Sequence, residues 1–404
     1  MLAFDKRIMT RATIIWIMSG IAVGLCIPMW GAEPAGKRKD KVVDSDKVAE
    51  QADWLKKNAT VAEDYVVSLF KTHQAIIFGE QHNIREHKTF VAGLIGRLYA
   101  EADVRCFAWE FSCPEDNERL ERLVTAKEFD ETELLAFARD QYIDWNSADH
   151  WDLIRAVWGV NHARPPGKPP MRMVGLRSRR FIDANQEWHT VQRGSQRFWE
   201  LLEFLRQGDD AGMAREVERH VIEPNVKGLV FVGRDHDMTK YTYPSSPPKW
   251  FLKQLGTVKI PEGLFPPDKP FRTTMGRLLY QKHGDRVFHV WLGAGLIPGI
   301  EVPMTAARLS NLGFTVEGSP FENVESRPEF FTDPAVPMKV LAQGFVSLGD
   351  HRELHANRVI PGFVSEDMFQ RYREYYEMAF ERSFCNAQEV DEYLQKHRWP
   401  ARKE

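Results

Sequence analysis

Acidic and histidine residues follow short apolar runs at several points of the sequence, and one spacing occurs twice. The motif Gly-x-x-His is found at Gly79–His82 and again at Gly233–His236, each time directly after an apolar run. Glycine lets the chain turn where a strand ends, and a histidine three residues later can face the crevice beyond it. Charged groups in such places are costly to bury unless they are paired, bound to a ligand or used in chemistry. We therefore predict one site with four catalytic candidates: Glu80, His82, Glu110 and His236.

Four further residues are candidates for ligand binding because they lie beside the same predicted strand ends. They are His87, Arg177, Asp235 and Gly293. Arg177 would supply a positive charge for a developing oxyanion, and Gly293 would leave room for a close ligand. Each also has an ordinary structural explanation. An aspartate such as Asp235 often caps the following helix, and the basic cluster that begins at Arg177 is typical of a solvated turn.

The strands that must position these residues are predicted from five short runs rich in apolar, β-branched and aromatic residues. The runs are residues 75–78, 106–109, 171–174, 229–232 and 287–291, and residues 345–348 would add a late strand. Amphipathic helical patterns lie between them. This alternation predicts an α/β fold: a mainly parallel sheet of five to six strands flanked by helices, with helical and Pro-rich insertions. In such a sheet, ligands bind beyond the carboxyl ends of the strands, where the candidate residues lie.

The chain divides into four predicted parts. Residues 1–32 are a signal peptide or membrane anchor, residues 33–60 a charged linker, residues 61–360 the α/β domain, and residues 361–404 helices that pack on it. Basic residues precede the apolar run 12–32, which is typical of an export signal and also long enough to span a bilayer. We expect an extracytoplasmic protein, periplasmic or secreted, in which this run is either cleaved or kept as an anchor.

A Pro-rich span at residues 244–270 contains seven prolines and cannot be regular structure. It is either a lid over the site or surface decoration.

The composition is that of a globular protein, with 43% hydrophobic and 27% charged residues. A formal net charge of −3 gives no reason to expect a nucleic-acid partner. Four cysteines are too few for a disulfide scaffold. The expected partner is a small-molecule or peptide substrate, and the N-terminal segment adds a predicted association with membranes.

Three sequence stretches together resemble a known superfamily. They are Ile77-Phe78-Gly79-Glu80-Gln81-His82, Ala108-Trp109-Glu110 and Gly233-Arg234-Asp235-His236. They are similar to motifs of the superfamily that joins erythromycin esterases, ChaN-like haem-binding lipoproteins and the Tiki/TraB proteins. The resemblance covers about residues 70 to 300, and Trp145 with the helical segment 149–161 looks most like the esterase branch. Two departures are Gly175-Leu176-Arg177, where that branch has Gly-x-Asp, and Gly233-Arg234-Asp235-His236, where it has His-Asn-x-His.

Three mechanisms fit these residues. In the first, His82 or His236 is the general base of a metal-free hydrolase of ester or amide bonds, with Glu80 or Glu110 orienting the imidazole. In the second, which the Tiki-like resemblance implies, His82, Glu110 and His236 bind a divalent metal of a peptidase. In the third, which the ChaN-like resemblance implies, the crevice holds haem and there is no catalysis.

We expect an exported hydrolase, with haem binding and a metal-dependent peptidase as the alternatives. The cofactor is therefore a divalent metal, haem or none. The substrate is not specified, because the insertions at about residues 178–227 and 238–275 shape the pocket and follow no pattern.

Overall fold

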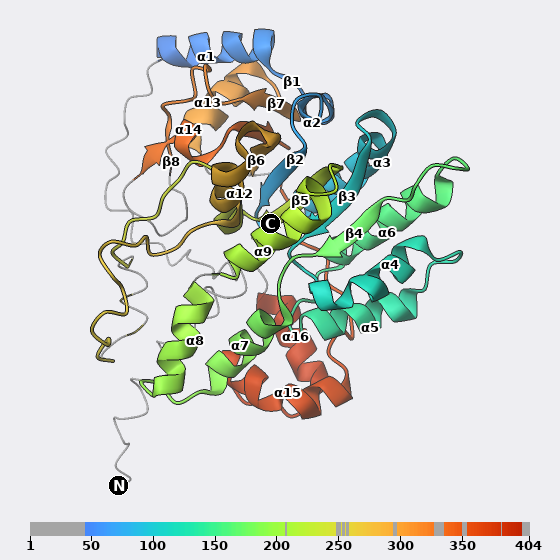
Figure 1. Cartoon of the computed structure of the whole chain (residues 1–404), viewed down its shortest axis with the longest axis vertical. Helices are drawn as coiled ribbons and strands as arrows, with labels where there is room; N and C mark the ends of the chain where they lie inside the picture. Colours follow the sequence, from blue (N-terminus) through green and yellow to red (C-terminus); the bar gives the residue numbers. More distant parts are fainter. Residues whose placement is uncertain are drawn as a thin grey trace.

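The computed structural model describes most of the chain beyond its N-terminal segment (Figure 1). The described residues are 45–206, 208–247, 252, 255, 258–293, 297–326, 335–349, 354–380 and 382–397. The predicted signal peptide or anchor, residues 1–32, lies outside them. Within the described ranges, every helix is too short or too polar to cross a bilayer.

A mainly parallel sheet forms the centre of the molecule. In the described part of the chain it has eight strands in the order β1-β7-β10-β6-β2-β5-β3-β4. Six of them are mutually parallel: β2 (Ala75–Glu80), β3 (Val104–Trp109), β4 (Arg172–Gly175), β5 (Lys227–Gly233), β6 (Val287–Gly293) and β10 (Gly344–Ser347). These are the six runs from which strands were predicted, so the α/β class and the parallel arrangement are confirmed.

The predicted strand count was too low because two antiparallel strands extend one edge. They are β1 (Thr60–Val61) and β7 (Leu312–Thr315). The helix before β7, α13 (Pro298–Ala307), ends with Arg308 in the left-handed region at φ 56°. Gly313 lies within β7, where a Cβ atom would come within 2.4 Å of the Tyr65 ring. Close packing of Tyr65 is therefore what requires a glycine at this position.

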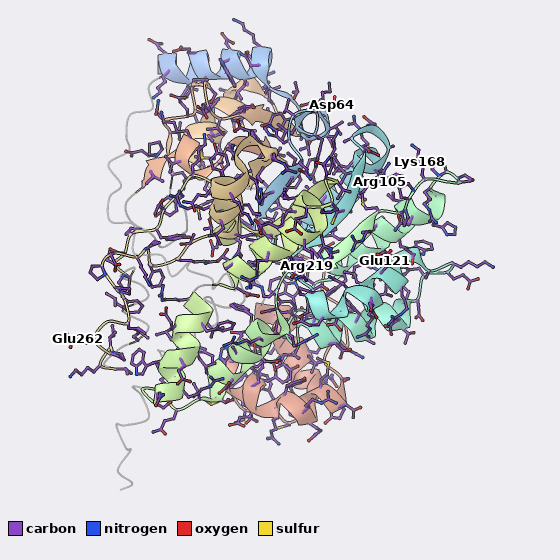
Figure 2. All side chains as sticks on the ribbon, viewed as in Figure 1. Asp64, Arg105, Glu121, Lys168, Arg219 and Glu262 are labelled. Carbon is purple, nitrogen blue, oxygen red and sulfur yellow. The ribbon has the colours of Figure 1, made fainter. Side chains whose placement is uncertain are left out.

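Residues alternate along the buried strands between two hydrophobic layers. On one face, Ile76 and Phe78 of β2 pack with α3 (Arg85–Glu101) and α6 (Ala148–Ala163). On the other face, Ile77 packs with α9 (Asp210–Val217) and α12 (Met275–His283). Apolar side chains fill the space between helices and sheet, while charged ones such as Lys168 and Glu262 are exposed (Figure 2).

The remaining elements surround this framework. They are α2 (Ala62–Leu69), η2 (Pro114–Asp116), α4 (Asn117–Thr125), α5 (Glu131–Gln141), α7 (Arg179–Thr190), α8 (Gln196–Arg206), η3 (Glu218–Ile222), α10 (Arg234–Asp237), η4 (Gly284–Arg286), α14 (Met338–Leu341), and the small hairpin of β8 (Glu325–Ser326) and β9 (Val336–Pro337).

The predicted charged linker, residues 33–60, is corrected over its described part. Residues 45–58 form helix α1, and it packs against α13. Leu55 is fully buried in this contact. The charges that suggested a linker lie on the solvent-facing side of an amphipathic helix. Few of its residues are buried, so its apolar side is a weak signal in the sequence.

The two predicted C-terminal helices are present as α15 (Glu366–Ala379) and α16 (Ala387–His397). The hydroxyl of Ser365 accepts from the N–H of Met368 at 3.3 Å, and the amide oxygen of Asn386 accepts from the N–H of Glu389 at 3.0 Å. Helix α15 lies beside α7 (Figure 1), and Tyr376 is fully buried in the main core.

In the Pro-rich span, the described residues 258–270 contain neither helix nor strand, but Leu252 and Leu255 are helical, so the prediction that the span has no regular structure is wrong at these two residues.

Candidate functional site

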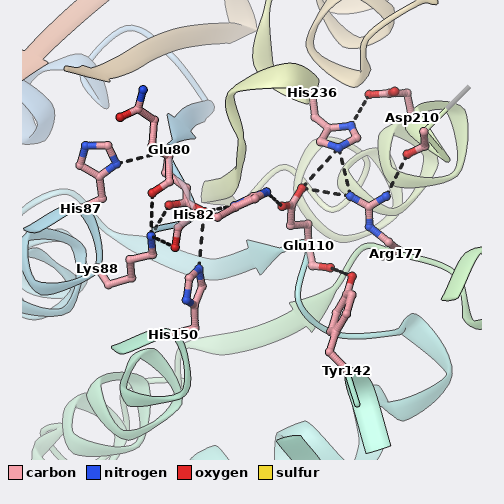
Figure 3. A network of polar contacts seen from close by, with 12 residues as sticks. Glu80, His82, His87, Lys88, Glu110, Tyr142, His150, Arg177, Asp210 and His236 are labelled. Carbon is pink, nitrogen blue, oxygen red and sulfur yellow. Dashed lines mark hydrogen bonds and ion pairs between the residues drawn. The ribbon is translucent and has the colours of Figure 1, made fainter. Parts of the chain in front are cut away.

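The candidate catalytic residues meet beyond the carboxyl ends of adjacent parallel strands (Figure 3). Glu80 is the last residue of β2, Glu110 follows β3 directly, and His236 lies in α10 directly after β5. Arg177 follows β4 by two residues. Since β2, β5, β3 and β4 are neighbours in the sheet, residues distant in sequence come together at one edge.

His82 lies between two carboxylates. Its Nδ1 contacts Glu80 Oε1 in a very short hydrogen bond, and its Nε2 lies 3.1 Å from Glu110 Oε1. Burial alone would lower the pKa of His82, but the negative charges of Glu80 and Glu110 outweigh it and raise the pKa above its ordinary value. The geometry therefore favours a protonated His82 that donates a hydrogen bond from each ring nitrogen.

A buried lysine holds the loop that carries His82. The Lys88 ammonium donates to Glu80 Oε2, to the carbonyl oxygen of Gln81 at 2.8 Å and to that of His82 at 2.7 Å. Burial would raise the pKa of Glu80, but Lys88 and His82 hold it well below its usual range. Glu80 is thus an ionised carboxylate whose two oxygens are both engaged.

Glu110 joins the two histidines. Its Oε2 lies 3.2 Å from Arg177 Nη2 and 3.7 Å from His236 Nε2. The same Nη2 of Arg177 donates to His236 Nε2 at 3.0 Å. The carboxylate therefore contacts His82 through one oxygen, and Arg177 and His236 through the other.

On its other side His236 contacts an aspartate and a second arginine. His236 Nδ1 is 2.9 Å from Asp210 Oδ1 and 2.8 Å from Arg272 Nη2, and Arg272 Nε donates to Asp210 Oδ2 at 3.0 Å. Burial and the positive charges of Arg272 and Arg177 hold the pKa of His236 well below its ordinary value. Burial, opposed by Arg272, raises the pKa of Asp210 to about 6. The lowered pKa makes His236 a neutral imidazole, and its acidic partner is Asp210.

Gly233 provides the space in which His82 sits. A Cβ atom on residue 233 would lie 2.6 Å from His82 Cε1 and 3.2 Å from Glu110 Oε1. The backbone of Gly233, at φ −60° and ψ 147°, is open to any residue. The first glycine of the second Gly-x-x-His motif is therefore required by the histidine of the first one.

Of the four predicted ligand-binding residues, Arg177 contacts the catalytic candidates directly. Arg177 belongs to the cluster, whereas Asp235 is half-buried and outside the hydrogen bonds of the described cluster. Its neighbour Asp237 instead pairs with His289 at 2.7 Å.

His87 and Gly293 have structural explanations. His87 Nδ1 accepts from the N–H of Gln81 at 3.0 Å, and burial together with Lys88 lowers the pKa of His87 to about 3. A Cβ atom on residue 293 would meet the Phe345 ring at 2.2 Å, so packing accounts for this glycine.

Four cluster residues were not predicted: Lys88, His150, Asp210 and Arg272. Lys88 had a signal, because it lies one turn before Val91 on the apolar side of α3, where a lysine needs a partner. Asp210 and Arg272 come from the two insertions that follow no sequence pattern. Arg272 directly follows the Pro-rich span, so this connection delivers a residue to the site.

His150 brings a third imidazole to Glu80. It is fully buried, its Nε2 lies 3.5 Å from Glu80 Oε1, and its Nδ1 lies 2.8 Å from Ser147 Oγ. Burial and the charge of Lys88 hold the pKa of His150 well below its usual value.

The donor atoms of Glu80, His82 and His150 lie within 4.8 Å of one another, which is close enough for a shared metal ion. However, Lys88 and His82 already engage both oxygens of Glu80, so a divalent cation would face an ammonium group. In the predicted set of His82, Glu110 and His236, the Arg177 guanidinium contacts both Glu110 and His236, so a metal ion bound there would face this positive charge. These positive charges disfavour a divalent metal at either position.

Residues 354–360, called the strap below, form hydrogen bonds with the loop that carries His82 and with the start of helix α6. Asn357 Nδ2 donates to the carbonyl oxygen of His82 at 2.6 Å, and the N–H of Ala148 donates to the carbonyl oxygen of Arg358 at 2.9 Å. Arg358 also forms an ion pair with the buried Asp149 at 2.7 Å. The strap thereby joins the His82 loop to the start of the helix that carries His150.

Comparison with known proteins shows a likeness of fold. No protein-family model and no curated protein matches the chain in sequence. A structural-genomics protein of Bacillus cereus superposes with a TM-score of 0.52 at 10% identity, over 78% of this chain and 99% of that one. A succinoglycan biosynthesis protein gives a TM-score of 0.40 at 12% identity, over 62% of this chain and 75% of that one. A haem-binding ChaN of Campylobacter jejuni gives 0.37 at 15% identity, over 59% and 88% respectively. The likeness to the Bacillus cereus protein is one of fold.

Proposed function

We propose that the cluster is the acid–base centre of a hydrolase that cleaves an ester or amide bond without a metal. The observation that carries this proposal is the placement of two imidazoles on either side of Glu110, with His236 oriented by Asp210. The environments displace the pKa values of these two histidines in opposite directions, the usual sign of an acid and a base in one site.

His236 is the proposed general base. When its Nδ1–H donates to Asp210, the lone pair of Nε2 accepts from Arg177 Nη2, and a water that took the place of this contact beside Glu110 could be deprotonated. The low pKa of His236 weakens it as a base in the empty site. An oxyanion that forms against Arg177 and Arg272 would offset their charges, so the basicity of His236 would rise as the reaction proceeds.

His82 is the proposed general acid. It is protonated between Glu80 and Glu110, and proton donation to the leaving group would restore the neutral imidazole. The guanidinium groups of Arg177 and Arg272 supply the preorganised positive charge that stabilises the tetrahedral intermediate.

The test is hydrolysis of p-nitrophenyl acetate by the purified chain and by His236→Ala and His82→Ala. Each variant should lose about 10²–10⁴-fold in kcat/KM, and kcat/KM of the parent should fall as pH rises through the raised pKa of His82. The matched control is His162→Ala, at an exposed histidine on α6. A chelator should leave the rate unchanged. Full activity in either site variant would overturn the assignment.

Haem binding is the second candidate, because the Campylobacter ChaN is described as binding haem cofacially. The test is titration of the purified chain with haemin. A shift of the Soret band on binding that is lost in His82→Ala or His236→Ala would show haem bound at the cluster. If the chain also fails to hydrolyse the ester, haem binding is favoured over the hydrolase.

We also propose that the protein is exported, on the basis of the apolar run 12–32 and the basic residues before it. A reporter enzyme that is active only outside the cytoplasm, fused after residue 60, should be active. Fractionation of the same cells separates a cleaved signal from a membrane anchor.

A further inference from the structure

His236 and Asp237 are neighbours in the one-turn helix α10, but their side chains contact opposite sides of the sheet edge. His236 reaches Glu110 and Arg177, which follow strands β3 and β4 (Figure 3). Asp237 reaches the other way, where its Oδ2 lies 2.7 Å from Nε2 of His289 on β6. Since the strand order is β6-β2-β5-β3-β4, the short helix after β5 lies between these two sets of contacts.

The carboxylate of Asp237 lies against the glycine of the first Gly-x-x-His motif. A Cβ atom on Gly79 of β2 would come within 1.3 Å of Asp237 Oδ2. A Cβ atom on Gly276 of α12 would lie 1.9 Å from the Asp237 carbonyl oxygen. Gly233 makes room for His82 in the same way. The glycines of the two motifs therefore each accommodate a side chain that the other motif carries or that directly follows it.

A second link joins the chain after Asp237 to the same histidine. The Thr239 hydroxyl donates to Gln343 Oε1 at 3.0 Å, and this oxygen also accepts from the N–H of His289 at 3.1 Å. The segment after α10 is thus tied to β6 directly through Asp237 and indirectly through Gln343.

Stability alone does not account for the pair of Asp237 and His289. Both residues are fully buried, and Asp237 Oδ1 and His289 Nδ1 have no hydrogen-bond partner among the described residues. A buried polar pair is often no more stabilising than apolar residues of similar volume, and each unpaired buried atom adds a cost. A hydrogen bond, however, has a preferred direction, so it can fix the orientation of a one-turn helix.

We propose that Asp237 and His289 are positioning residues that fix the orientation of His236. Their hydrogen bond holds α10 from the side opposite the cluster, and they do not touch the reacting atoms. The inference rests on the proposed hydrolase function, in which His236 is the general base.

The experiment measures kcat and KM of the full-length chain for p-nitrophenyl acetate. Asp237→Ala should lower kcat by about 10–100-fold with KM within about twofold, because it releases the base from its position. Asp237→Asn keeps an oxygen that accepts from His289, so it should retain kcat within about threefold. Asp391→Ala is the control, because this buried aspartate accepts from the N–H of Gly362 at 2.8 Å, and its loss should lower stability with kcat unchanged.

A double variant separates positioning from packing. In Gly79→Ala combined with Asp237→Ala, the new methyl group lies within 1.3 Å of the place that Oδ2 leaves, so it refills the space without the hydrogen bond. The melting temperature should exceed that of Asp237→Ala, whereas kcat should stay low. Recovery of kcat together with stability would assign Asp237 to packing and refute the proposal. If the alanine variants do not fold, Thr239→Val decides: a fall of about 3–10-fold in kcat supports the proposal, and the kcat of the parent chain refutes it.

The outcomes separate this inference from the proposed function. A folded Asp237→Ala protein with full kcat, or an equal loss in Asp237→Asn, would overturn the positioning role and leave the hydrolase intact. If the parent chain does not hydrolyse the ester, the hydrolase proposal fails, and the imidazole resonances of His236 decide about positioning. A change of these resonances in Asp237→Ala that is absent from Asp391→Ala would support it, and unchanged resonances would overturn it.

Discussion

Replacement of Gly233 by alanine tests whether the position of His82 matters for the chemistry. The added Cβ atom would lie 2.6 Å from His82 Cε1 and 2.7 Å from its Nε2. Ordinary contact between carbon atoms is at about 3.5 Å, so the ring must move by roughly 1 Å. That movement would break the 3.1 Å contact between His82 Nε2 and Glu110. A displacement of about 1 Å in a catalytic group costs about 100-fold in rate, which is about 2.7 kcal/mol of transition-state stabilisation.

The cost to the fold should be of the same order as the cost to activity, so stability and kcat/KM must be measured separately. The backbone at residue 233 suits alanine, so the penalty is one of overpacking, about 1–3 kcal/mol. The assay is kcat/KM for p-nitrophenyl acetate, together with urea denaturation and the imidazole resonances of His82. Gly93→Ala is the control: with nothing within 4 Å of the added atom on helix α3, it should raise stability by about 0.5–1 kcal/mol at full activity. A folded Gly233→Ala protein with the kcat/KM of the parent chain would refute the reasoning.

Three further changes have defined expectations. Lys88→Met should lower the free energy of unfolding by about 3–5 kcal/mol, because the buried Glu80 carboxylate loses one of its two cationic partners and the carbonyls of Gln81 and His82 lose a donor; a loss below about 1 kcal/mol in urea denaturation would argue against this ion pair. Glu110→Gln should lower the pKa of His82, since it removes one of two negative charges that raise it. The stability that the charge of His82 contributes is complete below the ordinary histidine pKa of about 6.5 and is lost as pH rises through the raised value. The variant should therefore lose less stability than the parent chain as pH rises from about 6.5 through the raised pKa of His82, and parallel curves would contradict this. Asn357→Ala should cost about 0.5–1.5 kcal/mol and speed amide hydrogen exchange in residues 81–84, because the carbonyl of His82 loses one of its two donors and keeps the other, Lys88; unchanged exchange would show that the strap does not hold this loop.

The sequence was sufficient to predict the parts of the fold that follow local rules. The buried strands are continuous apolar runs, and the residues that follow them lie at one edge because parallel strands end together. For this reason Glu80, Glu110 and His236 could be placed near one another without coordinates. The edge strand β1 could not be found, since a strand of two residues carries too little pattern. In β7 a glycine interrupts the short run Leu312-Gly313-Phe314-Thr315, which weakens its strand signal.

The partners of these residues were harder to predict because tertiary packing alone brings them in. Asp210 lies 26 residues before His236 and Arg272 lies 36 residues after it, on segments without a strand that would fix their direction. At His87 and Gly293, where nearness in sequence to a strand end predicted ligand binding, the structure also offers a structural role: a hydrogen bond from the N–H of Gln81 for His87, and close packing of Phe345 for Gly293.

The order of protein synthesis has a consequence for the strap at residues 354–360. As the polypeptide leaves the ribosome, every strand of the main sheet emerges before the strap does. The nascent α/β core can therefore collapse before the strap makes its contacts with the His82 loop and with the start of helix α6, which carries His150. Competence for chemistry should consequently appear late during translation, after the bulk of the tertiary structure has formed.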